Sequence, residues 1–185
     1  MRKYFIISLL FLSSGFTQTK EYNIDDLLEK DGLFREKFND EILKGDVYQM
    51  FGDMKMDLGY IKNGKKEGLW TWWFENGEKK NEGTFKDGKE NGLHKWWYKN
   101  GHKSEERTYK NGKKDGLWTK WYDNGQKGIE GTYKDGLEFG LWTYFYENGQ
   151  KQIEGIYKDW EKVGKWTYYN EDGSIKEVKE YPSPN

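Results

Sequence analysis

The side chains that most often carry catalysis or bind metals are scarce in this sequence of 185 residues, which contains two His and no Cys. His94 and His102 fall at most in neighbouring strands, and neither has a second metal-ligating residue at a recognisable spacing. No Gly-rich loop leads from a hydrophobic strand into a helix, as a phosphate site would require. The sequence therefore predicts no catalytic residues, no metal site and no cofactor. We expect a protein that is not an enzyme, and an enzyme of unrecognised type is the alternative.

Carboxylates recur at one fixed spacing and are the next groups with possible chemistry. Four Glu residues stand 24 positions apart, and they are Glu82, Glu106, Glu130 and Glu154. Because Lys is abundant in the same segments, we expect these carboxylates to pair with Lys across strands on a solvated face. Calcium binding by the acidic turns is the alternative, although turn formation already accounts for the Asp-Gly pairs.

Aromatic residues have two possible roles, since a Trp ring is either buried for its large apolar area or exposed to stack on a ligand. The sequence is 18% aromatic, and all ten Trp lie between Trp70 and Trp166. Most of these rings must cover the folded chain, because aliphatic residues are few, and only a surplus is available to a ligand. The candidate ligand-facing residues are Trp70, Trp72, Trp96, Trp118, Trp142, Tyr144 and Trp166.

The elements that position these rings repeat with a period of 24 residues. Related phrases, from GLWTWWFENG to GKWTYYNEDG, open at Gly68, Gly92, Gly116, Gly140 and Gly164. A second set of turn glycines keeps the same step at Gly64, Gly88, Gly112 and Gly136. Such periods indicate a repeat architecture, in which each unit buries its apolar face against its neighbours.

Each unit predicts one β-hairpin. An Asn-Gly or Asp-Gly pair such as Asn76-Gly77 follows each aromatic run, and a type I′ turn needs positive φ at both of its central residues. In the first unit we expect strands at 69–74 and 79–86, followed by a tight turn at Asp87-Gly88. No stretch has the helical spacing of a crossover connection. The predicted fold is all-β, an elongated single-layer antiparallel meander of about five 24-residue hairpin repeats with a short N-terminal lead-in.

Both faces of the first strand carry aromatic residues. The two sets are Leu69, Thr71 and Trp73 on one face, and Trp70, Trp72 and Phe74 on the other. A half-buried strand has one polar face, so either two layers pack here or one aromatic face is left for a partner. We expect Trp73 and its equivalent Trp121 to lie in the core, and the face with Trp70 and Trp142 to meet a ligand.

The array is expected to occupy 45–185, with a capping half-unit at 45–67 and units that start at residues 68, 92, 116, 140 and 164. Before it, residues 20–44 form a lead-in with a short helix and a strand. Asn23 or Asp25 is suited to cap that helix, Gly32 is suited to end it, and the strand lies within 33–38.

Residues 1–17 are typical of a secretory signal peptide. Two cations precede an apolar stretch from Tyr4 to Leu12, which is too short to span a bilayer, and small polar residues follow it. We therefore expect export to the periplasm, the cell surface or the medium. An uncleaved anchor is the alternative, because no clean cleavage motif is present.

The charge balance gives no electrostatic footprint for a polyanion. Lys and Arg number 31 and Asp and Glu 32, which leaves a formal net charge of -1. Nucleic-acid binding needs a clustered positive excess, so we expect no nucleic-acid partner. Contact with membrane lipid stays open at this point.

The phrases EGTFKDGKENG at 82–92, ERTYKNGKKDG at 106–116 and EGTYKDGLEFG at 130–140 are similar to the MORN motif. Over 45–181 the chain resembles the MORN repeat variant that is often labelled YwqK-type antitoxin. The resemblance implies a twisted, elongated, single-layer sheet of hairpins, with roles in scaffolding, protein contacts or a debated contact with lipid. Three residues depart from the pattern, because Arg107 and Trp160 replace a Gly and His94 replaces a Trp.

These observations favour a non-enzymatic exported scaffold or protein-binding module, in which an aromatic groove holds a protein segment. A glycan or cell-wall binder is the alternative, because sugar rings stack on Trp and GKWTYYNEDGSIKEV at 164–178 resembles choline- or wall-binding repeats. Those repeats are shorter and carry a Thr-Gly-Trp phrase that this chain lacks. The family label implies an antitoxin as a further alternative, which fits poorly with export.

Overall fold

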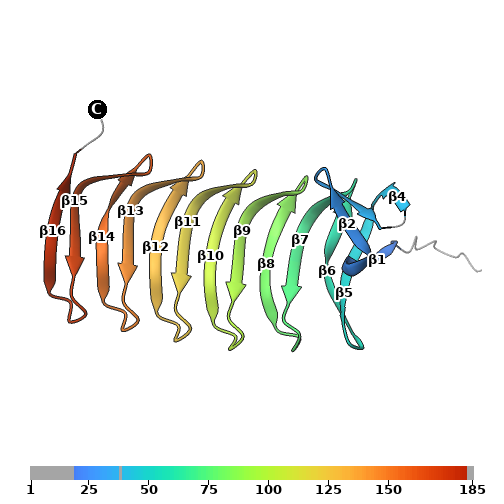
Figure 1. Cartoon of the computed structure of the whole chain (residues 1–185), viewed down its shortest axis with the longest axis horizontal. Coiled ribbons are helices and arrows are strands. Elements are labelled where there is room, and N and C mark those ends of the chain that lie inside the picture. Colours follow the sequence, from blue (N-terminus) through green and yellow to red (C-terminus); the bar gives the residue numbers. More distant parts are fainter. Residues whose placement is uncertain (1–18, 38, 183–185) are drawn as a thin grey trace, which may run out of the picture.

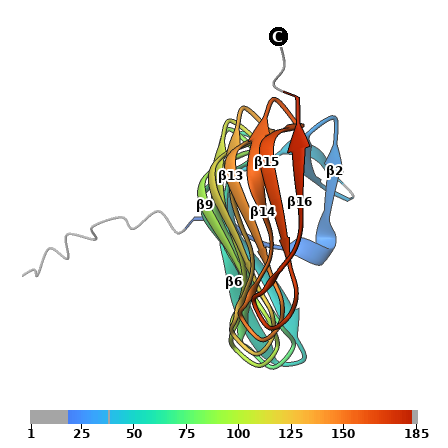
Figure 2. The ribbon, with the colours of Figure 1, turned by 90° about the vertical axis from the view of Figure 1, so that its left-hand side faces the viewer.

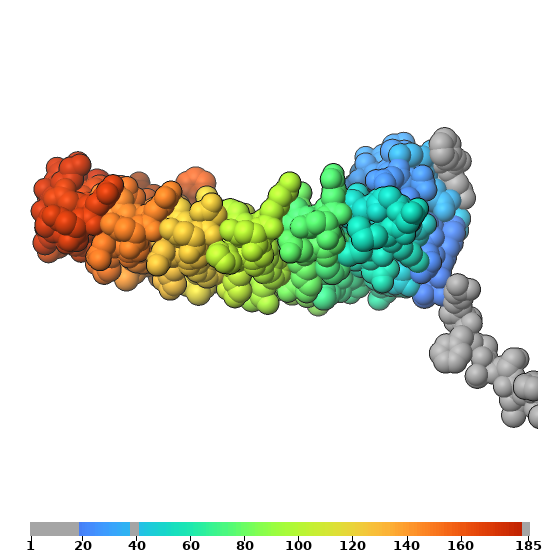
Figure 3. Space-filling view, turned by 90° about the horizontal axis from the view of Figure 1, so that it is seen from below, coloured from blue at the N-terminus to red at the C-terminus, as the bar shows by residue number. Residues whose placement is uncertain are grey.

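The computed structural model describes residues 19–37 and 39–182, and these residues form two β-sheets (Figure 1). The larger sheet has 13 strands and the smaller has three. The predicted all-β antiparallel meander is confirmed, and its hairpins follow one another along the long axis of the molecule (Figures 1 and 3). The predicted signal segment at 1–17 lies outside the described residues.

Each strand of the large sheet pairs with its neighbours in sequence order, with one exception at the start. The strands are β1 (Glu21–Asn23), β5 (Gly45–Phe51), β6 (Met54–Lys62), β7 (Lys65–Trp73), β8 (Lys79–Lys86), β9 (Lys89–Trp97), β10 (Lys103–Lys110), β11 (Lys113–Trp121), β12 (Lys127–Lys134), β13 (Leu137–Phe145), β14 (Lys151–Lys158), β15 (Glu161–Tyr169) and β16 (Ile175–Tyr181). From β5 to β16 every pairing is antiparallel, whereas β1 pairs with β5 in parallel.

Two kinds of turn alternate along the edges of this sheet. The tight two-residue turns are at Asp87-Gly88 and its equivalents, where Asp87 has a φ of 50° and Gly88 a φ of 81°. Positive φ at both central residues defines the type I′ turn, whose twist matches that of the strands it joins. Trp160, which stands where the other units have Gly, takes the same conformation with a φ of 74°.

The loop at Asn76-Gly77 and its equivalents belong to the second kind, and the predicted type I′ turn is wrong there. Gly77 has a φ of 84°, whereas Asn76 has no positive φ. The Gly77 N–H donates to the Phe74 carbonyl at 2.9 Å, and the Phe74 N–H donates to the Glu78 carbonyl at 2.8 Å. This is a type I turn followed by a left-handed residue. The Asn76 side chain favours it, because its Oδ1 accepts from the Glu78 N–H at 3.1 Å.

The longer strand of each unit is bent. β7 begins at Lys65 rather than at the predicted residue 69, and β9 likewise extends upstream of Gly92. Pairing between β8 and β9 jumps from Gly83–His94 to Phe85–Glu90, so Gly92, with a φ of 87°, lies in a bulge. A bulge bends its strand, and repetition of the bend gives the sheet its curved cross-section (Figure 2).

The predicted assignment of the two faces is reversed. Trp70, Trp142 and Trp166 have 0% exposure, whereas Trp73 and Trp121, which were predicted to form the core, are only half-buried. We name the side of the sheet that carries the buried Trp residues the aromatic face. The core of the array therefore lies on this face and is one residue out of step with the prediction.

A glycine on the strand before each buried Trp explains this reversal. A Cβ atom on Gly131 would lie 2.3 Å from the Trp142 ring, and one on Gly155 would lie 2.1 Å from the Trp166 ring. The indole rings thus occupy the space that a side chain would fill, flat against the backbone. The Trp142 Nε1 also donates to the Thr132 carbonyl at 3.3 Å, which satisfies its buried polar group.

In the last units, Tyr residues from the shorter strands separate the buried Trp rings in a column. Tyr133 lies edge-on to Trp142 with ring centroids 5.2 Å apart, and Tyr157 lies between Trp142 and Trp166 at 5.7 and 4.9 Å. Such T-shaped contacts add to the stabilisation from burial alone. The column does for this array what an aliphatic core does in other domains.

The first end of the array is capped by the lead-in. A single turn of 3₁₀ helix, η1 (Ile24–Asp26), follows Asn23, whose side chain accepts from the Asp25 N–H. The predicted short helix is wrong beyond this turn, because the next residues pair in a hairpin. The small sheet consists of β2 (Leu27–Lys30), β3 (Leu33–Glu36) and β4 (Asn39–Ile42).

This cap buries a small aliphatic core against the start of the large sheet (Figure 1). The buried cluster consists of Tyr22, Leu27, Leu43, Val47, Leu58, Ile61 and Trp70. It joins the aliphatic cap to the first ring of the aromatic column. Within the described residues, the structure contains no helix whose length and apolarity would let it span a membrane.

Candidate binding surface

The seven predicted ligand-facing residues divide into two groups. Trp70, Trp142 and Trp166 have no exposed area, so the prediction that they face a ligand is corrected. Packing against glycine backbone and neighbouring rings uses their whole surface. The residues that keep part of their ring accessible are Trp72, Trp96, Trp118 and Tyr144. These four flank the buried column along the aromatic face.

Charges of alternating sign lie at one repeated position of this face. The residues are Lys66, Glu90, Lys114, Glu138 and Lys162, each 24 positions after the last. The Lys66 Nζ lies 4.9 Å from the Trp70 ring centroid and 4.8 Å from that of Trp72, within range of cation–π attraction. Burial lowers the pKa of Lys66, and it also lowers the pKa of Lys114, which is less deeply buried. The first, bent part of each long strand thus carries a charged residue, and the three Lys residues lie over Trp rings of the aromatic face.

Tyrosine hydroxyls add neutral polar groups to the aromatic face. Burial raises the pKa of Tyr133 to about 12 and raises that of Tyr144 as well. Both hydroxyls therefore stay protonated at neutral pH and are able to donate a hydrogen bond.

One position interrupts the column of rings. Arg107 stands where the next unit has Gly131, so Trp118 has no bare backbone to lie against and is only half-buried. The Arg107 guanidinium lies 5.2 Å from the Trp96 ring centroid and 5.8 Å from that of Trp118. Glu105 accepts hydrogen bonds from Arg107 Nε and from Trp118 Nε1. The second unit thus contains an ion pair, and its guanidinium lies between the indole rings of Trp96 and of Trp118 in the third unit.

Neighbouring loops of the second kind are tied together by side chains. The Tyr98 hydroxyl donates to the Trp121 carbonyl at 2.7 Å, and Tyr122 and Tyr146 make the equivalent bonds at 2.7 and 2.8 Å. A second tie joins the side-chain amides of Asn100, Asn124 and Asn148 to the carbonyls of Asp123, Glu147 and Glu171.

The first loop lacks both ties. Phe74 stands where the next three units have Tyr, and it has no hydroxyl to donate. The amide of Asn76 donates to the Glu78 carboxylate at 3.0 Å instead of reaching the next loop. The loop at 74–78 is therefore not tied by these side chains to the next loop at 98–102.

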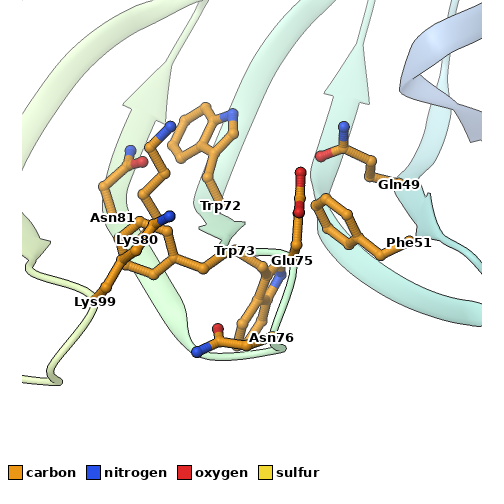
Figure 4. Close-up of a pocket in the computed structure, with 10 residues that line it drawn as sticks. Gln49, Phe51, Trp72, Trp73, Glu75, Asn76, Lys80, Asn81 and Lys99 are labelled. Carbon is orange, nitrogen blue, oxygen red and sulfur yellow. The ribbon is translucent and has the colours of Figure 1, made fainter.

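An open hollow of about 560 Å³ lies beside the first loop (Figure 4). The Trp72 ring projects between Asn81 and Lys80 on one side and Phe51 and Gln49 on the other (Figure 4). The side chains of Gln49, Glu75, Lys80 and Asn81 line it and make no hydrogen bond or ion pair with any other described residue. An aromatic surface beside unpaired polar groups is the usual composition of a ligand site.

The two histidines hold structural positions. His94 is 2% exposed and replaces a Trp in the buried column, with ring centroids 5.3 Å from Phe85 and 4.9 Å from Tyr109. His102 lies in a loop, where its Nδ1 is 2.7 Å from the Asp123 carbonyl oxygen. In the part of the chain that the structure describes, no group of three or more His, Cys, Asp or Glu could hold a metal ion.

The repeated Glu residues lie on the opposite face and pair with Lys, mainly within their own strand. Glu82 lies 2.7 Å from Lys79, three residues earlier, and 3.6 Å from Lys95 across the strand pair. The hydrogen bond from Lys79 lowers the pKa of Glu82. The predicted pairing of these carboxylates with Lys is confirmed, whereas the predicted cross-strand geometry is wrong for the main pairs, which join residues three apart in one strand. Leu69 and Leu141, exposed by 57% and 58%, share this face.

Five consecutive matches to one family model cover the array. The model describes the MORN repeat variant and matches residues 66–87, 90–111, 114–135, 140–159 and 162–181, which is more than half of the chain. The chain belongs to the MORN repeat variant family. A comparison with curated proteins found no match.

Neighbouring MORN units are joined by packing between a Trp of one unit and a Gly of the unit before it. Each matched segment begins near the start of a long strand and ends after the following short strand, as 66–87 does over β7 and β8. The buried Trp142 belongs to one MORN unit, and Gly131, which it covers, belongs to the unit before. Stability of the MORN array therefore depends on contacts between neighbours, as in other repeat proteins.

Trp160 is an aromatic residue whose exposure the sequence reasoning did not predict. It is 64% exposed and lies at a tight turn of the MORN array with a φ of 74°. The available signal was a bulky residue where the other units have Gly. A left-handed conformation costs a non-glycine residue about 1–2 kcal/mol, and an exposed ring gains little from burial. Trp160 is thus not explained by the folding of its own unit.

Replacement of Trp160 by Gly is expected to raise the free energy of unfolding by about 1 kcal/mol, because glycine adopts this φ without steric cost. Denaturant unfolding followed by circular dichroism measures the change. Trp160→Ala is the control, since it removes the ring but keeps the strain, and it should stay within about 0.5 kcal/mol of the parent. A loss of stability in the Gly variant would show that the ring itself supports the turn.

Proposed function

We propose that this MORN repeat variant protein is a non-enzymatic, exported scaffold that binds a protein segment along its aromatic face, with the hollow beside Trp72 as the anchor point. Membership of the family supports a repeat-based binding scaffold. The observation that carries the proposal is the hollow, which combines a partly exposed indole ring with polar side chains that make no hydrogen bond or ion pair with another described residue. The signal-like segment at 1–17 supports export.

The spacing of groups on the aromatic face suits an extended polypeptide. Neighbouring strands lie about 4.8 Å apart, so equivalent residues of successive units recur about every 10 Å. A chain in the extended polyproline II conformation has three residues per turn and advances about 3.1 Å per residue. Every third residue of such a segment therefore points the same way and lies about 9 Å further on, near the same position of the next unit. The alternation of Lys66, Glu90 and Lys114 then selects a segment with charges of alternating sign at that interval.

A glycan is the second candidate ligand, and the composition of the hollow favours it. Sugar rings stack their CH faces on indole, while side-chain amides and carboxylates bind hydroxyl groups. Trp72, Gln49, Glu75 and Asn81 offer these groups around one hollow. The hollow lies at the first end of the array, between the half-unit and the first two units, whereas the aromatic face extends along the whole array, which is why we place the protein segment first.

We expect the immobilised full chain to retain a specific protein from an envelope extract, and expect Trp72→Ala to reduce retention about tenfold, as loss of a central aromatic anchor does. Trp121→Ala is the matched control, because Trp121 is a half-buried Trp on the opposite face of the sheet. Retention that is equal in parent and Trp72→Ala would remove the hollow from the proposal.

A polysaccharide array, probed with the same three proteins, separates the two candidates. If a sugar binds in a way that depends on Trp72 and no protein is retained from the extract, the ligand is a glycan and not a protein segment. Retention of a protein with no sugar bound would support the scaffold.

A further inference from the structure

The two ends of the large sheet differ in how they are covered. β1 and the small sheet enclose the first end, whereas β16 pairs only with β15 among the described strands and lies at the far edge of the sheet (Figure 1). Every residue of β16 except Tyr181 is exposed, including Ile175 at 61% and Val178 at 44%. An open edge presents unpaired backbone N–H and C=O groups that are able to pair with another strand.

The sequence of β16 is complementary to itself in antiparallel orientation. It reads IKEVKEY, and when Val178 lies opposite Val178 of a second copy every Lys lies opposite a Glu. The other pairs are Lys176 with Glu180 and Glu177 with Lys179. Ile175 lies outside this match, because the pairing of β15 with β16 shifts at a bulge between Glu177 and Ile175. Opposite charges placed directly across antiparallel strands are stabilising, and like charges are destabilising.

Neighbouring registers lack this match. Residues that lie opposite one another in two paired strands must point to the same face of the sheet, so the register shifts only in steps of two residues. The nearest alternatives therefore place Glu177 opposite Glu177 of the second copy, or Lys179 opposite Lys179. Each of these shifts sets two identical charges opposite one another. β16 has two charged residues of each sign, so each of its charges is able to lie opposite an opposite charge of a second copy.

We propose that two copies of this chain pair through β16 about a two-fold axis perpendicular to the sheet, which joins both arrays into one continuous antiparallel sheet. Val178, exposed by 44%, would lie against Val178 of the second copy on the axis. The exposed pair of Lys179 and Glu177, 3.2 Å apart within one strand, gains a second partner for each charge. The occupant of the open edge is therefore a second copy.

The joint sheet carries both aromatic faces on the same side. A ligand with two binding segments then meets two equivalent surfaces, and the second contact forms at a high effective concentration. Because the contact consists of one strand from each copy, its area is small for a stable dimer, and we expect association that depends on protein concentration.

Charge reversal tests the register with the full chain. Glu177→Lys/Glu180→Lys makes all four charges positive, and Lys176→Glu/Lys179→Glu makes them all negative. In analytical ultracentrifugation the parent should dimerise as concentration rises, each double variant should associate at least about tenfold more weakly, and an equimolar mixture of the two should dimerise again. A parent that stays monomeric, variants that dimerise like the parent, or a mixture that stays monomeric would each overturn the proposal.

Cross-linking tests the position of the axis, since the natural chain contains no Cys. In Val178→Cys the two Cys residues lie directly opposite one another with Cβ atoms about 4.5–5.5 Å apart. A movement of about 1 Å brings them to the roughly 3.5–4.5 Å of a disulfide. Copper(II)-phenanthroline in air accepts the two electrons released when two thiols form the disulfide. Leu141→Cys, at a residue that is 58% exposed on a different strand, is the control. Rapid cross-linking of the first variant alone supports the two-fold pairing, and equal or absent cross-linking in both would overturn it.

Discussion

Trp142→Ala is expected to lower the free energy of unfolding by about 3–5 kcal/mol, the range for truncation of a large buried aromatic residue. The Trp142 ring is fully buried, contacts Tyr133 and Tyr157 edge-on, and lies against the backbone at Gly131. Strand backbones surround the site and cannot collapse into the space that the indole leaves. Guanidinium unfolding followed by circular dichroism measures the loss.

Trp121→Ala is the matched control for this change. Trp121 is a half-buried Trp on the opposite face of a neighbouring long strand, so its truncation removes less buried area. We expect a loss of about 1–2 kcal/mol, since roughly half of an aromatic side chain is involved. Equal losses for the two variants would contradict the assignment of the core to the aromatic face.

The repeat length and the hairpin pairing could be predicted because they depend on local signals. Turn glycines at 24-residue intervals, such as Gly88, fix where strands end, and short connections make the strands antiparallel. Two turn types share the Asn-Gly or Asp-Gly signature, however. The side chain of Asn76 distinguishes them by bonding to the N–H of Glu78, and this bond depends on a loop one residue longer than the tight turn.

The buried face could not be predicted by alternation alone, because aromatic residues occupy both faces of each long strand. The deciding residue lies on another strand. Gly155 pairs with Trp142 and lies under Trp166, and this relation appears only once the register between strands is known. A search for small residues at the repeat period of the Trp residues would have found the column of glycines.

The hollow beside Trp72 could not be predicted from the sequence for a related reason. It exists because Phe74 and Asn76 do not make the ties that Tyr98 and Asn100 make to the following loop. A sequence shows that Phe lacks the Tyr hydroxyl, but it does not show what that hydroxyl would have bonded. Irregularities in a repeat are therefore the places to look for a site once the regular contacts are known.

Gly131→Ala is expected to destabilise the array by about 2–3 kcal/mol, near the upper end for overpacking of a core. The added Cβ would lie 2.3 Å from the Trp142 ring, so either the ring or the strand must move. Backbone strain is not the cause, since Gly131 has no positive φ. Denaturant unfolding of the full chain measures the loss.

A double-mutant cycle identifies the ring as the source of this cost. In the Trp142→Ala background the neighbour that clashes is gone, and Ala is a better strand residue than Gly by roughly 0.5–1 kcal/mol. Gly131→Ala should then be neutral or slightly stabilising, which gives a coupling energy of at least about 2 kcal/mol between two residues of adjacent units. If the substitution costs the same in both backgrounds, the clash is with the backbone, and the Trp–Gly contact is not what binds one repeat to the next.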